Sequence, residues 1–236
     1  MEPKISIIIP IYNENSQIIP LLDNLDKACV QLPQQPEIIF ADGGSTDGSI
    51  KLMKEQLQMR TNPSQVFTGK RGRGQQLAAA SNIASGDILV FLHADTRITG
   101  QYFKEMLTAI NNGAQWGCAR LHFDNDKLSL KLIAYFSHLR VRYQSLVFGD
   151  QTMFCLKKFY AQVGGFAPMF FMEDYEFSQR AARLAKPVEL TAIAISSARQ
   201  YMEHGIWRTN WRIQKNKHRY RSGKYTLEEL YQLYAQ

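Results

Sequence analysis

The chain has 236 residues, of which 45% are hydrophobic and 11% aromatic, so it can bury a sizeable core. No apolar stretch approaches the roughly 20 residues of a membrane-spanning helix, and three widely spaced cysteines argue against a disulfide framework and a zinc site. The net charge is +7, but seven basic and no acidic residues lie between positions 205 and 224, which leaves 21 of each sign elsewhere. Because this basicity belongs to a tail rather than to a domain face, nucleic acid is not an expected partner.

The first half of the chain alternates between predicted strands and predicted helices. A continuous apolar run within residues 86–96 is typical of a strand buried on both faces. Earlier strands are predicted for residues 5–9, 37–41 and 65–68, each followed by apolar residues at helical spacing. This alternation predicts an α/β fold with a doubly wound, mostly parallel central sheet and helices on both faces.

The second half is less regular. Strands are predicted for residues 116–123, 152–156 and 188–195, and helices for residues 128–147, 157–163 and 172–185. No linker rich in Pro, Gly or Ser separates the halves, so we expect one domain over residues 1–204. Residues 1–4 lead directly into the first strand without a visible signal peptide, and we therefore expect a cytoplasmic protein.

The buried run of residues 86–96 ends in the polar sequence His93-Ala94-Asp95-Thr96. Open α/β sheets bind their ligands at the carboxyl ends of such strands. A carboxylate delivered there is well placed to hold a cation. We therefore expect Asp95 to bind a divalent metal ion.

Two other strand ends carry residues suited to a nucleotide. The Gly-rich basic turn at residues 69–74 precedes a helix, where backbone amides, the helix dipole and cations can converge on a phosphate, although a solvated basic turn is the alternative. Its spacing matches neither the P-loop nor the dinucleotide pattern. Asp42 could accept hydrogen bonds from a base or ribose; its alternative role is a helix cap, which Asp47 fits better.

Glu173 and Asp174 place two carboxylates beside the apolar residues Phe170, Phe171 and Met172. Partial desolvation raises the pKa of a carboxyl group and makes it a better general base. The alternative is a charge pair that only stabilises a helix N-terminus. The residues alone leave both roles open.

Together these segments resemble the family 2 glycosyltransferases, which have the GT-A fold. The matching pieces, in order, are residues 10–14 (PIYNE), 41–48 (ADGGSTDG), 72–74 (GRG), 91–96 (FLHADT), 149–151 (GDQ), 164–166 (GGF) and 173–174 (ED). The resemblance covers roughly residues 4–204. Gly43 replaces the second acid of the usual DDGS sequence. With this change and the segment of residues 196–201, the chain resembles a small single-domain bacterial subgroup of the family.

The resemblance implies a metal-dependent inverting transferase that moves a sugar from a nucleotide diphosphate donor to an acceptor hydroxyl. The donor half would span about residues 1–96 and the acceptor half about residues 97–204. The residues implied to bind the nucleotide-sugar are Pro10, Tyr12, Glu14, Asp42, Arg71, Gly72 and Ala94. Asp174, with Glu173 beside it, would supply the base, and Gly149, Asp150 and Gln151 would lie near the acceptor.

The metal implied by the resemblance is Mg²⁺ or Mn²⁺, held by Asp95 as the last acid of a DxD motif. His93 replaces the first acid of that motif; it could ligate the cation or simply pack at the strand end. His204 could close over the diphosphate and reach the metal.

Two other functions compete with glycosyl transfer. A sugar nucleotidyltransferase normally has a Gly-rich loop directly after its first strand, where this chain has residues 10–14 (PIYNE). A non-catalytic nucleotide-sugar-binding protein at the membrane surface would not need both Asp95 and Asp174. Both alternatives are therefore disfavoured.

The basic tail, residues 205–236, interleaves Trp207, Trp211 and Tyr220 with cations. Such a segment could lie on an anionic membrane surface, on the inner face of the membrane. It could equally be a solvated helix that packs its two tryptophans on the domain or on a partner subunit. A lipid-linked acceptor would make attachment to the membrane useful.

Overall fold

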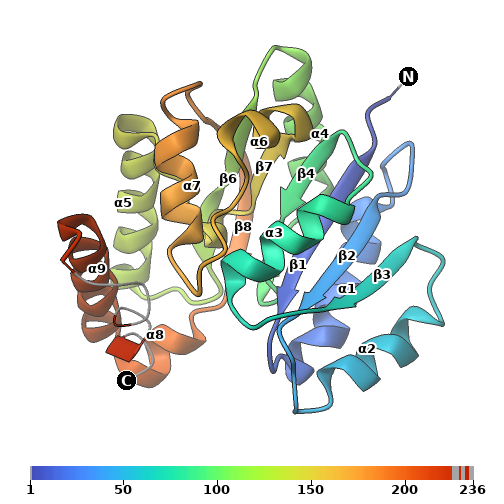
Figure 1. Cartoon of the computed structure of the whole chain (residues 1–236), viewed down its shortest axis with the longest axis horizontal. Helices are drawn as coiled ribbons and strands as arrows, with labels where there is room; N and C mark the ends of the chain where they lie inside the picture. The colour runs from blue at the N-terminus through green and yellow to red at the C-terminus, as the bar shows by residue number, and fades with distance from the viewer. Residues whose placement is uncertain (1, 225–228, 230–231, 234–236) are drawn as a thin grey trace.

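The computed structural model describes residues 2–224, 229 and 232–233 (Figure 1). In this part of the chain, eight strands form one sheet in the order β3-β2-β1-β4-β7-β6-β8-β5. Their bounds are β1 (Ile5–Ile11), β2 (Glu37–Asp42), β3 (Ser64–Thr68), β4 (Ile88–Phe91), β5 (Thr96–Arg97), β6 (Trp116–Phe123), β7 (Met153–Leu156) and β8 (Val188–Ser196). Neighbouring strands pair in parallel, except that β7 is antiparallel to β4 and β6, and β5 is antiparallel to β8. The expected α/β fold with a mostly parallel sheet is confirmed.

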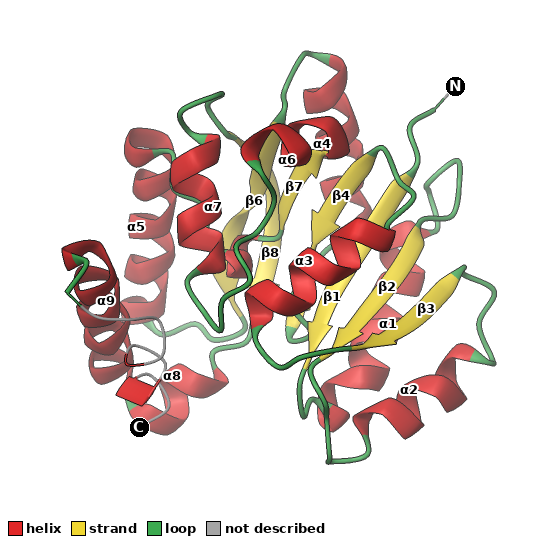
Figure 2. Ribbon diagram, in the orientation of Figure 1, coloured by secondary structure: helices red, strands yellow, loops and turns green. Residues whose placement is uncertain are grey.

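Helices cover both faces of this sheet. They are α1 (Asn15–Cys29), α2 (Ser49–Leu57), α3 (Arg73–Ile83), α4 (Gly100–Asn111), α5 (Leu128–Gln144), the short 3₁₀ helix η1 (Gly149–Gln151), α6 (Lys157–Val163), α7 (Glu173–Ala181), α8 (Arg199–His204) and α9 (Ile206–Ser222). In Figure 2, α3, α6 and α7 lie in front of the sheet, whereas α1 lies behind it.

The core explains why β1 is apolar at nearly every position. Ile7 and Ile9 pack with α1 and α4 on one face, and Ile8 packs with α3 on the other. All three side chains are fully buried. A strand covered on both faces loses the alternation of apolar and polar residues seen in half-exposed strands. The three cysteines are free and buried, as their apolar surroundings indicate.

The larger differences from the sequence-based prediction concern the helices α4, α5 and α7. Helix α4 was not predicted, although Tyr102, Phe103 and Met106 are its buried residues. Helix α5 ends at Gln144 rather than at residue 147, because Ser145 adopts a left-handed conformation with φ 55°. Helix α7 is shorter than predicted at both ends: Met172, with φ 65°, precedes its first residue, and Ala181 is its last.

The basic tail folds onto the second half of the domain as α9, directly after α8. Ile206 and Tyr201 pack against a small apolar cluster that includes Phe123, and Thr209 of α9 is buried. Trp207 and Trp211 are 65% and 62% exposed, so of the alternatives for the tail, packing of both tryptophans on the domain is not what the structure shows. None of the described helices is long and apolar enough to cross a bilayer. Residues 225–228, 230–231 and 234–236 of the predicted tail lie outside the described residues.

Candidate active site

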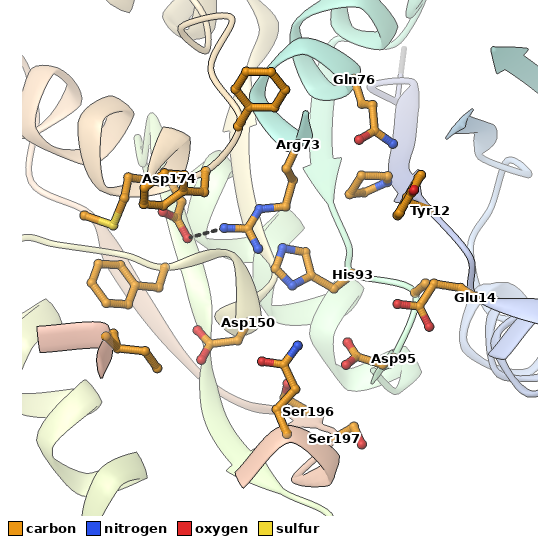
Figure 3. A pocket seen from close by; sticks show the side chains of 18 of the residues that line it. Tyr12, Glu14, Arg73, Gln76, His93, Asp95, Asp150, Asp174, Ser196 and Ser197 are labelled. Atoms are coloured by element: carbon orange, nitrogen blue, oxygen red, sulfur yellow. Dashed lines mark ion pairs between the residues drawn. The ribbon is translucent and has the colours of Figure 1, made fainter. Parts of the chain in front are cut away.

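A cavity of about 420 Å³ lies beyond the carboxyl ends of β1, β4 and β8 (Figure 3). Of the sequence-predicted residues, those that line it are Pro10, Tyr12, Glu14, Arg71, Gly72, His93, Ala94, Asp95, Asp150 and Asp174. The predicted residues that are not part of this lining are Asp42, Gly149, Gln151, Glu173 and His204. The fold therefore brings most of the predicted donor, metal and base residues to one place.

One side of the cavity is held by contacts between the loops after β1 and β2. The Asn13 amide donates to Ser45 Oγ (2.9 Å), and Asn13 Oδ1 accepts from the Thr46 amide (2.9 Å). Gln76 Nε2 donates to the carbonyls of Ile11 (2.8 Å) and Ala41 (2.7 Å) from the start of α3. These contacts fix the ends of the two strands relative to each other.

Asp42 shapes its own turn rather than facing the cavity. It is 1% exposed, and its carboxylate accepts from the Gly44 amide (2.9 Å), the Ser45 amide (3.1 Å) and Ser45 Oγ (2.6 Å). Its predicted contact with a base or ribose has no support in this arrangement. Asp47 does bind the first amide of α2, accepting from Ser49 N (3.0 Å).

The Gly-rich turn presents side chains, not its first helical amides, to the cavity. The Arg73 amide donates to the Phe170 carbonyl (3.2 Å) and the Gly74 amide donates to the Met169 carbonyl (3.0 Å). The expectation that these amides meet a phosphate is therefore wrong. The Arg71 guanidinium lies 4.1 Å from the centre of the Tyr12 ring, and both residues line the cavity. Binding of an anion by this turn depends on Arg71 and Arg73.

Asp95 and Glu14 form an acidic site at the other side of the cavity. Asp95 is partly buried, and Glu14 Oε2 is buried without a hydrogen-bond partner, 3.6 Å from Arg199 Nη2. Burial and the nearby charge of Asp95 raise the pKa of Glu14. A cation between the two carboxylates would remove this repulsion.

These residues fit a cation that arrives with its substrate. A cluster of three or more His, Cys, Asp or Glu side chains able to hold a metal is absent from the described residues. Mg²⁺ is commonly held by one or two carboxylates together with substrate phosphates, and Asp95 and Glu14 match that donor set. His204 is exposed at the end of α8 and is not among the residues that line the cavity.

His93 packs in the middle of the site, beside the Arg73 guanidinium in Figure 3. Burial, and then the charge of Arg73, lower the pKa of His93 to about 4 against the opposite effect of Asp95 and Asp174. A Cβ at Gly149 would overlap the His93 imidazole, so the ring is in close contact with η1. The neutral imidazole is thus held in place by packing.

Glu173 and Asp174 occupy different environments although they are adjacent. Asp174 lines the cavity; its Oδ2 accepts from the Gly149 amide (2.8 Å), and Arg73 Nη2 lies 3.7 Å away. Glu173 is fully buried and forms an ion pair with Arg73 Nε. Burial raises the pKa of Glu173 to about 7, although Arg73 lowers it. Asp174 is therefore placed to act on a ligand, and Glu173 is placed to hold Arg73.

Within η1, Asp150 alone lines the cavity. Its Oδ1 is buried without a hydrogen-bond partner, and burial raises the Asp150 pKa to about 6 although Arg140 opposes this. Gln151 is buried and its Oε1 accepts from Arg140 Nη2 (2.8 Å) and the Phe148 amide (3.2 Å). Gln151 thus holds η1 in place through these hydrogen bonds.

Several lining residues were not assigned a role from the sequence. They are Arg73, Gln76, Ser196, Ser197, Gln200, Asn216 and Lys217. Arg73 lay within a recognised motif, residues 72–74, and could have been found there. Gln200 lay within the segment of residues 196–201 that contributed to the resemblance, but Asn216 and Lys217 of α9 carried no signal, because their approach to the cavity depends on how the tail folds back.

A family model described as "Glycosyl transferase family 2" matches residues 6–173 of the chain. The chain belongs to glycosyl transferase family 2. This match spans both Asp95 and Glu173, and it ends one residue before Asp174.

Solved glycosyltransferases share the fold. The mannosyltransferase PcManGT from Pyrobaculum calidifontis, in complex with GDP-Man and Mn²⁺, superposes with a TM-score of 0.69 at 19% identity, over 92% of this chain and 62% of that chain. S. aureus TarS 1–349 in complex with UDP-GlcNAc gives a TM-score of 0.64 at 17% identity, over 82% of this chain and 58% of that chain.

Curated family 2 relatives match over a shorter segment. An undecaprenyl-phosphate 4-deoxy-4-formamido-L-arabinose transferase from Proteus mirabilis is 33% identical over 112 residues, which is 47% of this chain and 34% of the relative. The Yersinia pestis protein of the same name is 37% identical over 94 residues, covering 39% of this chain and 29% of the relative. The matched segment thus spans about a third of the length of these relatives.

Proposed function

We propose that this family 2 member is a metal-dependent inverting glycosyltransferase that moves a sugar from a nucleotide diphosphate donor to an acceptor hydroxyl. The observation that carries the proposal is that Asp95 and Asp174, from the two halves of the chain, line one cavity together with Arg71 and Arg73. Family membership disfavours a nucleotidyltransferase. PcManGT and TarS, whose structures hold GDP-Man and UDP-GlcNAc, support a nucleotide-sugar donor.

The reaction follows from the positions of these side chains. The acceptor hydroxyl loses its proton to the Asp174 carboxylate while its oxygen forms a bond to the anomeric carbon. The bond from that carbon to the diphosphate oxygen breaks, and the electron pair leaves with the nucleoside diphosphate. Attack opposite the leaving group inverts the configuration. Arg71 and Arg73 stabilise the negative charge that develops on the diphosphate.

A divalent cation would be held by Asp95, with Glu14 beside it. When bound, Mg²⁺ or Mn²⁺ would supply charge neutralisation at the diphosphate of the donor. The Mn²⁺ in the PcManGT complex supports this choice of cation. His93, packed against Gly149 and Arg73, would keep the adjacent Asp95 in position.

We further propose a lipid-linked acceptor and attachment at the cytoplasmic membrane surface through residues 205–236. The names of the curated relatives, which specify undecaprenyl phosphate, support a lipid-linked acceptor. On α9, the exposed Trp207 and Trp211 alternate with basic residues, a composition suited to the headgroup region of an anionic bilayer.

A thermal-shift panel of nucleotide diphosphate sugars, each with Mg²⁺, Mn²⁺ or a chelator, tests donor and metal together. We expect one donor to raise the melting temperature of the wild type, and to raise it further with the cation, since a ligand that binds only the folded state stabilises it. Asp95→Asn should lose the cation-dependent part of that shift. Asp126→Asn, a change at a fully exposed carboxylate, should behave as the wild type. A panel without any shift would contradict the proposal.

A further inference from the structure

Helix α9 forms part of the wall of the active-site cavity. Ile213, Asn216 and Lys217 line it, although the family match ends at residue 173. The helix is held there by aromatic contacts: the Tyr220 and Tyr175 ring centres are 6.0 Å apart, and Lys217 Nζ lies 5.4 Å from the Tyr175 ring centre. The end of the chain therefore contributes to the site in addition to presenting a basic surface.

A second cavity of about 410 Å³ lies between α5 and α9, which run side by side in Figure 1. It shares Phe148, Asp150, Tyr201, Ile213 and Lys217 with the active-site cavity, so the two cavities are adjacent. We call this second cavity the α5–α9 groove.

The outer part of the α5–α9 groove is apolar and open. Ile133, Phe136, Leu139 and Tyr143 of α5 line it. Phe136 is 62% exposed and Tyr143 is 74% exposed. Exposed aromatic side chains beside a groove that leads to a reactive site are suited to receiving an apolar chain from solvent or from a lipid surface.

The inner part of the groove carries two cationic side chains, Lys217 and Arg140, beside the carboxyl group of Asp150. Among the described residues, neither Lys217 nor Arg140 forms an ion pair with a carboxylate. Burial, and then the charges of Arg140 and Arg221, lower the pKa of Lys217. Cations that repel one another in a partly buried site favour the binding of an anion.

A buried hydrogen-bond donor next to Lys217 points to the same ligand. Asn216 is 2% exposed and lines the active-site cavity. Its Oδ1 accepts from Arg219 Nη1 (3.3 Å), but its Nδ2 has no hydrogen-bond partner. Leaving such a donor unsatisfied costs roughly 1–3 kcal/mol. An acceptor oxygen of a ligand would satisfy it.

We infer that the α5–α9 groove is the acceptor subsite and that it takes a phosphate-bearing lipid. The phosphate lies at Lys217, which lines both cavities, with Arg140 on the groove side and Asn216 on the side of the active-site cavity. The apolar chain follows the α5 side chains out to Phe136 and Tyr143. A hydroxyl on the head group then reaches Asp174 and Asp150 in the shared cavity. This inference rests on the proposed glycosyl transfer to a lipid-linked acceptor, and it adds the place in the fold where that acceptor binds and the residues that select it.

Binding of farnesyl phosphate in neutral detergent tests the inference without a bilayer. Wild-type protein should bind farnesyl phosphate at least tenfold more tightly than farnesol or inorganic phosphate, because both the charge and the chain contribute. Lys217→Met, which keeps the apolar stem of the side chain, should weaken binding at least tenfold. Lys215→Met is the matched control on the exposed face of α9 and should change binding less than twofold.

A second pair of variants tests the apolar part of the groove. Phe136→Ser should weaken binding of farnesyl phosphate several-fold, whereas Tyr135→Ser, at a neighbouring residue that is 56% exposed and does not line the groove, should not. Melting temperatures of all four variants show whether each remains folded.

The outcomes separate this inference from the proposed function. If the protein binds a nucleotide-sugar but not farnesyl phosphate, or if Lys217→Met and Phe136→Ser bind it as the wild type does, the acceptor subsite is refuted and the donor reaction stands. If Lys217→Met instead weakens binding of the nucleotide-sugar, Lys217 belongs to the donor site and the inference fails. If no nucleotide-sugar binds, the proposed function itself fails.

Discussion

At the scale of single residues, adjacent side chains in this site differ because of what surrounds them. Asp174 faces the cavity and accepts from the Gly149 amide, whereas Glu173 is fully buried and pairs with Arg73. Arg73 contacts both carboxylates. Removing Glu173 would therefore act on catalysis through the position of Arg73, whereas removing Asp174 would remove the proposed base itself.

Gly149→Ala tests the packing between η1 and His93. The new Cβ would overlap the imidazole, so we expect the unfolding free energy to fall by about 1–3 kcal/mol. Transfer should slow as well, because Gly149 also positions Asp174. Gly100→Ala is the control, since its Cβ would meet nothing closer than 3.4 Å. Chemical unfolding of both variants measures the effect, and equal stability would show that the ring can move aside.

Some of the site residues could be predicted from local sequence patterns, and others could not because their surroundings depend on the fold. Asp95 and Asp174 were found because a strand end and a charged pair beside apolar residues are local patterns, whereas Tyr12 was assigned only through the family resemblance. Asp42 was assigned to the ligand because the backbone amides that occupy its carboxylate depend on a turn conformation that composition does not reveal. His204 was placed near the metal only by resemblance, and its exposed position on α8 does not favour that role.

At the scale of elements, α3 shows why a local motif can mislead. Its Gly-rich start predicted a phosphate site made of backbone amides, but carbonyls of the loop before α7 accept from the Arg73 and Gly74 amides. A Cβ at Gly74 would collide with this loop, which explains the glycine by close approach rather than by phosphate. The partner loop lies almost a hundred residues away, beyond the reach of any local pattern.

Helix α4 is joined to β8 through Glu105, and this contact makes stability depend on pH. Its carboxylate accepts from the amides of Thr191 (2.7 Å) and Ala192 (2.9 Å). Partial burial raises the pKa of Glu105, but hydrogen bonds from Gln101, Thr191 and Ala192 outweigh it and lower the pKa from 4.5 to about 2. A depressed pKa stabilises the fold above the unfolded-state value, and this contribution is lost as pH falls through the folded-state value.

Glu105→Gln should therefore destabilise the protein by about 1 kcal/mol at pH 7, a figure reduced for the partial exposure of the group. The difference from wild type should shrink as the pH is lowered from about 4.5 towards 2. Urea unfolding at pH 7 and near pH 3 measures this, with the exposed Glu55→Gln as control. A difference that is the same at both pH values would contradict the assignment.

The exposed tryptophans of α9 allow membrane binding to be tested without disturbing the fold. Replacing Trp207 and Trp211 by Ser should change the unfolding free energy by less than about 0.5 kcal/mol, because both side chains are mostly exposed. Flotation with vesicles that contain anionic lipid should fall several-fold. Met59→Ser removes an equally exposed apolar side chain from the end of α2 and should float as the wild type. Unchanged flotation of the double variant would exclude these residues as an anchor.

At the scale of the whole molecule, the alternation of strands and helices predicted the parallel part of the sheet correctly. The position of β7 between β4 and β6 could not be predicted, because long-range packing rather than local pattern decides which strand pairs there. The same limit applies to α9, which the sequence separated from the domain at residue 204. Since α9 lines the cavity, we propose that the functional unit extends beyond that boundary, and deleting residues 205–236 would damage the site as well as the tail.

The central claim is that this cavity transfers a sugar with Asp174 as the base. Turnover of the donor found in the thermal-shift panel, measured at saturating donor for wild type and Asp174→Asn, tests it most directly. Asparagine keeps an oxygen for the Gly149 amide but cannot take the proton of the acceptor, so donor binding should persist while turnover falls about 10²–10⁴-fold. Unchanged turnover in Asp174→Asn would contradict this account.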